Sequence, residues 1–120
     1  MNEKKYNWIK ISDAIDSPAQ ILFGEDIRLI EVNGKNICIT EYNGNLYAFD
    51  RRCPHAGAML EYGWINDQGH IVCHHHQYAF DMQNGKNTSG EGFYLQTYPV
   101  KLNEEGVFIG FERKGFLSWF

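Results

Sequence analysis

The sequence predicts an all-β protein, folded as an antiparallel sandwich or a small barrel. Turn-forming segments that end in glycine recur along the chain, at residues 33–34, 43–44, 67–69, 84–85 and 105–106. Three of them are Asn-Gly, the pair that best closes a tight antiparallel hairpin, because both positions accept a positive φ. Short strands separated by such turns are typical of sandwiches and barrels.

Segments of β-branched and aromatic residues lie between these turns and predict strands. In chain order the predicted strands are Ile27–Val32, Asn36–Thr40, Leu46–Phe49, His70–Val72 and Val107–Phe111. One helical turn is expected near Asp13–Asp16, closed by Pro18, because proline does not continue a helix. No internal repeat or linker interrupts the pattern, so residues 1–120 are expected to form a single domain.

The composition supports a globular protein. The chain is 43% hydrophobic and 15% aromatic, which is enough to build a core. Its net charge of −4 argues against nucleic acid or an anionic membrane as the partner, since either requires a basic face. The charged start of the chain is not followed by an apolar run of signal-peptide length, and no stretch reaches the roughly 18 apolar residues of a membrane span. We therefore expect a soluble, cytoplasmic protein.

One region departs from the strand pattern. Between Arg51 and Gln77 the chain carries all five histidines and two of the three cysteines. An odd number of cysteines does not suit a disulfide framework, and cysteines in a reducing compartment more often bind metal or lie buried. Cys38, the third cysteine, lies in a predicted strand and is expected to be a buried core thiol.

The region contains two short pairs, Cys53-x-His55 and Cys73-x-x-His76. Each pair fits within one loop, so each loop can present one thiolate and one imidazole to a common point. A [2Fe–2S] cluster needs this number of ligands, because each tetrahedral iron takes two bridging sulfides and two protein ligands. The same four side chains could instead form a tetrahedral zinc site. Zinc fingers favour Cys-x-x-Cys and His-x-x-x-His halves, so the mixed halves favour the cluster.

These residues also carry a family resemblance. The run Cys53–Leu60, with Gly63 shortly after it, resembles the first cluster-binding loop of Rieske proteins. The run Cys73–His76, followed by Phe80-Asp81, resembles the second. The resemblance implies an antiparallel β sandwich with a smaller cluster-binding subdomain, at about residues 51–83.

The resemblance also implies how the ligands divide. Cys53 and Cys73 would bind the buried iron, and His55 and His76 would bind the outer iron, near solvent. His74 and His75 are then expected to be neighbours of the cluster rather than ligands, and His70 has no assigned role.

The sequence departs from the family pattern at several positions. His74 stands where the second loop usually has proline, and Gln77 where it has glycine. The segment Ser89–Tyr94 contains no proline, whereas Rieske proteins tend to cover the cluster here with a proline-rich loop. Features that raise the potential of respiratory Rieske proteins are also missing. Those proteins have a disulfide that links the two loops, and this chain has Ala58 and His75 at its two positions. They also have a serine hydroxyl that donates to a bridging sulfide and a tyrosine hydroxyl that donates to a cysteine sulfur. Here Tyr78 replaces the serine and Phe80 replaces the tyrosine. We expect a potential at the low end of the Rieske range.

The resemblance implies a soluble Rieske ferredoxin. Such a protein is a one-electron carrier and not itself an enzyme. It would take electrons from a flavoprotein reductase and pass them to a terminal oxygenase, such as an aromatic-ring hydroxylating dioxygenase. Two alternatives stay open: the small subunit of an assimilatory nitrite reductase, and a cluster-based sensor or interaction module. The oligomeric state is not determined by the sequence, and a monomer is the default expectation.

Two surfaces are candidate contacts with a partner. The first is the cluster tip, where His55 and His76 would lie nearest solvent, with Gly57, Ala58, Gln77 and Tyr78 around them. The second is the apolar segment Gly115–Phe120, which is expected to pack back on the sandwich or to contact another subunit.

Overall fold

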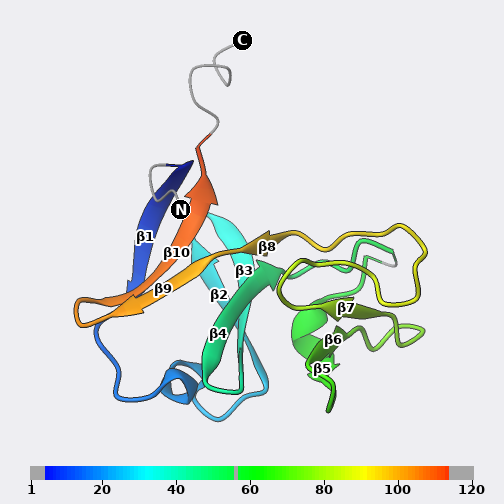
Figure 1. The fold of residues 1–120 in the computed structure, drawn as a ribbon, viewed down its shortest axis with the longest axis horizontal. Helices are drawn as coiled ribbons and strands as arrows, with labels where there is room; N and C mark the ends of the chain where they lie inside the picture. Colours follow the sequence, from blue (N-terminus) through cyan, green and yellow to red (C-terminus); the bar gives the residue numbers. More distant parts are fainter. Residues whose placement is uncertain (1–4, 56, 114–120) are drawn as a thin grey trace.

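A computed structural model describes residues 5–55 and 57–113 and confirms the all-β class. Ten strands of these residues form three antiparallel sheets (Figure 1). The first sheet consists, in spatial order, of β1 (Tyr6–Ser12), β10 (Gly106–Glu112) and β9 (Val100–Asn103). The second consists of β2 (Ile27–Val32), β3 (Lys35–Tyr42), β4 (Asn45–Asp50) and β8 (Thr97–Tyr98). The third consists of β5 (Trp64–Ile65), β6 (His70–Val72) and β7 (Ala79–Asp81).

All five predicted strands are present, several with one or two additional residues at their ends. The β2–β3 turn has φ values of 53° at Asn33 and 79° at Gly34, and the β3–β4 turn has 52° at Asn43 and 83° at Gly44. Two successive positive φ angles match the twist of the flanking strands and fix the register of both hairpins. The predicted Asn-Gly turns are therefore confirmed at these two positions.

The predicted helical turn is misplaced. Residues 13–16 are not helical, and a 3-10 helix, η2, instead runs over Pro18–Leu22. Pro18 begins this helix rather than ending one, because its fixed φ suits the first helical position, where its missing N–H has no acceptor to lose. Ile21 and Leu22 of the helix are buried.

The second sheet is the middle layer and is buried on both faces. Successive side chains of a strand point to opposite faces. In β3, Ile37 and Ile39 pack with residues of β10 in the first sheet. Cys38, between them, points to the other face and packs in a separate group of apolar core residues that contains Phe49, Ile71 and Phe80. The third sheet thus packs against the outer face of the sandwich, at the right of Figure 1.

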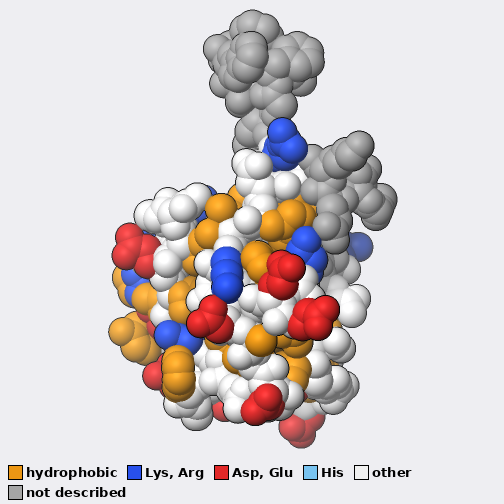
Figure 2. All heavy atoms as spheres, turned by 90° about the vertical axis from the view of Figure 1, so that its left-hand side faces the viewer, with side chains coloured by type: hydrophobic (Ala, Val, Ile, Leu, Met, Phe, Trp, Pro, Cys, Tyr) orange, Lys and Arg blue, Asp and Glu red, His pale blue; other side chains and the backbone are white. Residues whose placement is uncertain are grey.

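The opposite side of the molecule carries both signs of charge. Figure 2 views the molecule from the left of Figure 1, where β1 and β9 lie, and shows acidic and basic side chains interspersed among apolar ones. The net charge of −4 is therefore not gathered on this face as a single acidic patch. No helix formed by the described residues is long and apolar enough to cross a membrane. The expectation for Gly115–Phe120 lies outside the described residues.

Candidate iron–sulfur centre

Two similarly built hairpin loops carry the predicted ligands. The first loop (53–58) is flanked by an antiparallel bridge between Arg52 and Met59, and the second loop (73–78) by the β6–β7 pair Val72 and Ala79. In each loop the backbone N–H of the opening cysteine donates to the carbonyl of the last residue, with N···O distances of 2.8 Å and 2.7 Å. The two loops therefore hold their cysteines in the same way.

The two thiols adjoin each other in the core. Cys53 is 1% exposed and Cys73 is 0% exposed, and both belong to the apolar cluster between the second and third sheets. The Cys73 sulfur accepts a hydrogen bond from the backbone N–H of His75, at 3.4 Å. Burial raises the pKa of the Cys73 thiol, this N–H lowers it, and contact with the Cys53 thiol raises it. Iron binds cysteine as the thiolate, so the predicted role of these two residues requires protons to leave buried sulfur.

The two imidazoles lie at the surface around one pocket. His55 and His76 are exposed, and both line a pocket of about 420 Å³ together with Tyr78, Ser89 and Glu91. The ring centroid of His55 lies 3.8 Å from that of Tyr78, and that of His76 lies 6.4 Å from it. The second loop thus places an aromatic ring beside the histidine of the first loop. The predicted ligands therefore form two pairs: two thiols inside the protein and two imidazoles at its surface.

The other histidines lie outside these pairs. The His74 ring makes an edge contact with the exposed Tyr62, with centroids 6.4 Å apart. The His75 ring lies 4.3 Å from that of His76, while its backbone contacts Cys73. His70 is half-buried in β6. This arrangement agrees with the predicted role of His74 and His75 as neighbours.

The tip of the second loop has a backbone conformation that suits glycine. His76 and Gln77 have φ values of 62° and 56°, in the left-handed region. A residue other than glycine costs of order 1–3 kcal/mol there. The family glycine that Gln77 replaces would occupy the second of these positions without that cost. The departure noted in the sequence therefore falls on a strained residue.

We predict that Gln77→Gly raises the free energy of unfolding by about 0.5–1 kcal/mol. Relief of the left-handed strain exceeds the extra chain entropy that glycine has in the unfolded state. Urea unfolding of the wild-type chain and the variant measures the difference. Gln83→Gly is the matched control, because Gln83 is exposed and is not among the positive-φ residues of the described chain. Stabilisation by both substitutions would show that the effect does not come from φ at position 77.

Sequence reasoning missed an ion pair at the base of the first loop. Arg51 precedes this loop and Glu61 follows it in the 3-10 helix η3 (Leu60–Tyr62), and their side chains form a partly buried salt bridge. The thiol of Cys38 donates to the Glu61 carboxylate, with an S···O distance of 3.7 Å. Burial first, and Glu61 second, raise the pKa of Cys38, which is the buried core thiol that the sequence predicted. Only tertiary packing brings these three residues together.

The ion pair makes stability depend on acidity. Burial, the largest single effect, opposes ionisation of Glu61, but the hydrogen bonds and charge of Arg51, a backbone N–H and the Cys38 thiol together outweigh it and hold the pKa of this carboxyl below its usual value. A lowered folded-state pKa contributes stability above the unfolded value of about 4.3, and this contribution is lost as pH falls through the folded pKa. We predict that Glu61→Gln destabilises the protein most at neutral pH and progressively less in acid.

Urea unfolding at a series of pH values from neutral to acid tests this prediction. Glu105→Gln, at an exposed carboxylate in the β9–β10 turn, is the control and should show no such trend. A Glu61→Gln deficit that is the same at every pH would contradict the role assigned to the charge.

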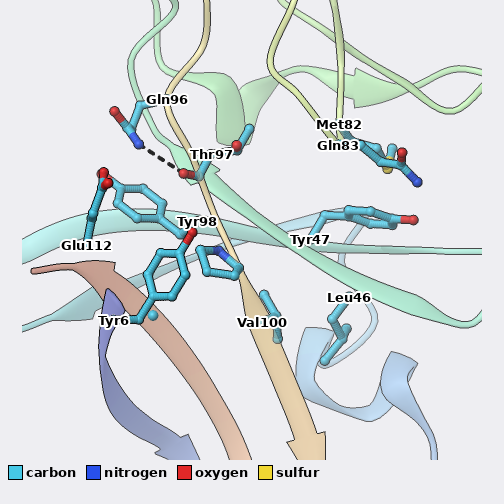
Figure 3. Close-up of a pocket in the computed structure, with 12 residues that line it drawn as sticks. Tyr6, Leu46, Tyr47, Met82, Gln83, Gln96, Thr97, Tyr98, Val100 and Glu112 are labelled. Atoms are coloured by element: carbon cyan, nitrogen blue, oxygen red, sulfur yellow. Dashed lines mark hydrogen bonds between the residues drawn. The ribbon is translucent and has the colours of Figure 1, made fainter. Parts of the chain in front are cut away.

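A second pocket lies away from the predicted ligands. It has a volume of about 440 Å³ and lies between the ends of β4, β8 and β10, where Tyr6, Tyr47 and Tyr98 line it (Figure 3). The Tyr98 hydroxyl donates to the Asp50 carboxylate at 2.7 Å, and burial together with this bond raises the pKa of Tyr98. None of the four predicted ligands lines this pocket, so it is separate from the candidate centre.

The chain matches the family model of the Rieske [2Fe-2S] domain over residues 12–99. It is 33% identical over 107 residues to the ferredoxin component of the naphthalene 1,2-dioxygenase/salicylate 5-hydroxylase systems of a Ralstonia species, a match covering 88% of this chain and 97% of that protein. The chain therefore belongs to the Rieske [2Fe–2S] family, as its two motifs predicted.

Two solved structures show the same fold. The ferredoxin of carbazole 1,9a-dioxygenase from Nocardioides aromaticivorans IC177 has a TM-score of 0.70 at 18% identity, covering 89% of this chain and 99% of that one. A Mycobacterium tuberculosis protein assigned as the small subunit of an NADH-dependent nitrite reductase has a TM-score of 0.74 at 16% identity, covering 90% and 97%. At these identities the likeness concerns the fold alone.

The residues present fit the cluster that the family implies. No three His, Cys, Asp or Glu side chains within residues 5–55 and 57–113 are grouped so that they could hold one metal ion. A [2Fe–2S] cluster does not need such a group, because each iron takes only two protein ligands. The adjoining buried thiols and the two imidazoles at one pocket provide two such pairs.

Proposed function

We propose that this chain is a one-electron carrier whose [2Fe–2S] cluster is held by Cys53, His55, Cys73 and His76. The observation that carries the proposal is the arrangement of two buried, adjoining thiols below two exposed imidazoles on similarly closed loops. In this proposal the thiolates bind the inner iron and the imidazoles the outer iron. Residues of about 51–83 then form the cluster-binding subdomain of a single domain.

The chain's own residues determine what such a centre can do. When bound, the cluster accepts and returns one electron, passing between net charges of 0 and −1 with its two thiolates. The apolar cluster around Cys53 and Cys73 excludes water from the sulfur side. The exposed His55 and His76 lie where a partner can approach the outer iron closely. This combination suits transfer of electrons through the imidazole edge.

The partners we propose are a flavoprotein reductase as donor and a terminal oxygenase as acceptor. The proposal is supported by the Ralstonia relative, which is a ferredoxin component of such systems and which this chain covers almost entirely. The docking face would be the cluster tip around His55 and His76, with Gln77, Tyr78 and the acidic Glu91 beside them. A basic patch on the partner would complement the net charge of −4.

A stoichiometric electron-transfer experiment tests this function. The cluster-loaded chain is mixed anaerobically with a catalytic amount of a flavoprotein reductase from a naphthalene-type system and with half a mole of NADH, a two-electron donor, per mole of chain. One electron per cluster is expected, measured by bleaching of the visible absorbance. A stoichiometric amount of oxidised terminal oxygenase should then restore the colour. A chain that is reduced but never reoxidised by an oxygenase would contradict the proposed acceptor. Stable association with a sirohaem enzyme would favour the nitrite reductase alternative instead.

We predict a midpoint potential of about −150 mV, at the low end of the Rieske range. Hydrogen bonds to sulfur stabilise the more negative, reduced state and so raise the potential. Within the described residues, one hydrogen bond to a ligand sulfur from outside the thiol pair is found, from the backbone of His75 to Cys73. Phe80, at the position of the family tyrosine, has no hydroxyl to add another. A redox titration that gives a value above roughly +100 mV would contradict this argument.

A further inference from the structure

A third loop, residues 87–93, covers the side of the candidate centre. Its two ends are joined by a hydrogen bond from the Asn87 N–H to the Phe93 carbonyl, at 3.1 Å. Between these ends, Gly90 and Gly92 have φ values of 79° and 88°, and no proline occurs in the loop. The two glycines leave the backbone of the loop free, and there is no proline to restrict it. Contacts with the rest of the protein must therefore fix the loop conformation.

The buried side chain of Asn87 supplies those contacts. Asn87 is only 4% exposed, one of the two buried polar residues of the described chain. Its Oδ1 accepts hydrogen bonds from the Ser89 hydroxyl at 2.6 Å and from the Glu91 N–H at 3.2 Å. Its Nδ2 donates to the Ala79 carbonyl at 3.2 Å. Both lone pairs of Oδ1 are used, so the oxygen of this amide is fully paired.

These bonds connect the third loop to the end of the second ligand loop, and one ring contact connects it to the first. Ala79 directly follows the second loop, and its carbonyl also accepts the Thr88 N–H at 3.0 Å. Phe93, at the other end of the third loop, packs edge-on against the His55 ring of the first loop, with centroids 4.8 Å apart and planes at 86°. The buried amide of Asn87 thus joins the third loop to the second, and Phe93 extends this connection to the first.

We propose that Asn87 is a positioning residue of the centre: it holds the third loop so that Phe93 fixes the His55 ring and keeps water from that side of the cluster. The proposal rests on the proposed ligand set, because Phe93 acts on the cluster through His55. It adds a residue that carries no ligand atom and lies in none of the recognised motifs. Replacing Asn87 should therefore change the midpoint potential and the stability of the cluster in fully loaded protein, and not only the stability of the fold.

The direction of the effect follows from charge. Reduction takes the cluster from a net charge of 0 to −1 when two thiolates bind it. Water that reaches the cluster stabilises the charged state more than the neutral one, so release of the third loop should raise the midpoint potential. The same opening should admit small oxidants and chelators, and so speed loss of the visible absorbance.

The test compares Asn87→Ala with Asn84→Ala, both loaded with cluster to the wild-type iron content. Asn84 is exposed, lies in the same hairpin, and has a side-chain oxygen that accepts a hydrogen bond from the N–H of Lys86, a residue outside the third loop. For Asn87→Ala we expect at least a threefold change in the equilibrium constant for reduction. At 59 mV per tenfold for one electron, this is a positive shift of about 28 mV. Bleaching in air should be at least about threefold faster, and Asn84→Ala should match the wild type.

Two further variants keep the test decisive if Asn87→Ala does not fold. Asn87→Leu keeps about the same side-chain volume and adds no charge, but loses both the acceptor for Ser89 and Glu91 and the Nδ2 donor to Ala79. Phe93→Leu removes the edge contact with His55 at a half-buried position. Both should shift the potential in the same direction, and the double variant should shift it by less than the sum, because the two residues act in series.

The outcomes separate this inference from the proposed function. A fully loaded Asn87 variant that loses thermal stability but keeps the wild-type potential and bleaching rate would overturn the inference, and so would an equal shift in Asn84→Ala. In both cases the ligand proposal would stand. A wild-type chain that never takes up iron and sulfide would overturn both. A shift confined to the Asn87 and Phe93 variants would support the inference.

Discussion

Cys73→Ser is expected to take the chain from about two irons and two acid-labile sulfides to near none, and to leave the protein colourless. In the proposed set each iron relies on two protein ligands, so the loss of one thiolate leaves the inner iron incompletely bound. Cys73 is fully buried beside Cys53, and a serine hydroxyl there is a hard, weakly acidic donor that replaces a soft thiolate poorly. Iron and sulfide analysis after anaerobic, iron-replete preparation measures the effect.

The third cysteine provides the matched control. Cys38→Ala removes a thiol that is equally buried and packs in the same core cluster, but whose hydrogen-bond partner is Glu61. This variant should lose some stability and retain the full iron and sulfide content. Loss of the cluster in both variants would mean that core packing, rather than ligation, explains the result. A zinc-only preparation of the wild-type chain would refute the cluster itself.

The histidines allow a second comparison within one loop. His76→Ala should abolish the cluster, because it removes a proposed ligand of the outer iron, whereas His74→Ala should leave the iron content unchanged. His74 lies two positions away, is also exposed, and contacts Tyr62. The pair therefore separates ligation from the general effect of removing a surface imidazole. A colourless His74→Ala variant would require a different ligand assignment in the second loop.

Local chemistry explains why much of the centre could be predicted from the sequence. The turns at Asn33-Gly34 and Asn43-Gly44 follow from the positive φ that those residues accept, and the neighbouring strands pair across them. The two Cys/His pairs each lie within one short loop, so their spacing limits how they can be arranged. A prediction that depends on neighbours in the chain is well supported by sequence alone.

Features that depend on distant parts of the chain could not be predicted in the same way. Strand β1 (Tyr6–Ser12) pairs with β10 at the other end of the chain, and although its aromatic and β-branched residues suit a strand, no hairpin turn links it to this partner. Asn87 reads as an ordinary turn residue, and only the fold shows that it is buried and bonded to Ala79. The helical turn is a different kind of miss: it is expected before Pro18 and lies after it, although the preference of proline for the first helical position is a local rule.

Gly85→Ala is expected to lower the free energy of unfolding by about 3–5 kcal/mol. Gly85 has a φ of 76°, and a Cβ atom there would overlap the carbonyl oxygen of Leu95. That neighbour is backbone and is itself held, because the Leu95 N–H donates to the Gly85 carbonyl at 2.7 Å. Relief of the overlap must break this pairing, which closes the chain on either side of the third loop.

Gly90→Ala isolates the cause of that loss. Gly90 has nearly the same φ, 79°, but a Cβ atom there would meet nothing within 4 Å. Both variants bear the left-handed strain, of about 1 kcal/mol for alanine, and only Gly85→Ala adds the overlap with Leu95. Urea unfolding should therefore show a difference of at least about 2 kcal/mol between them. Equal losses would mean that the Gly85–Leu95 approach is not tight, and that the ends of the third loop are held by the Asn87 contacts alone.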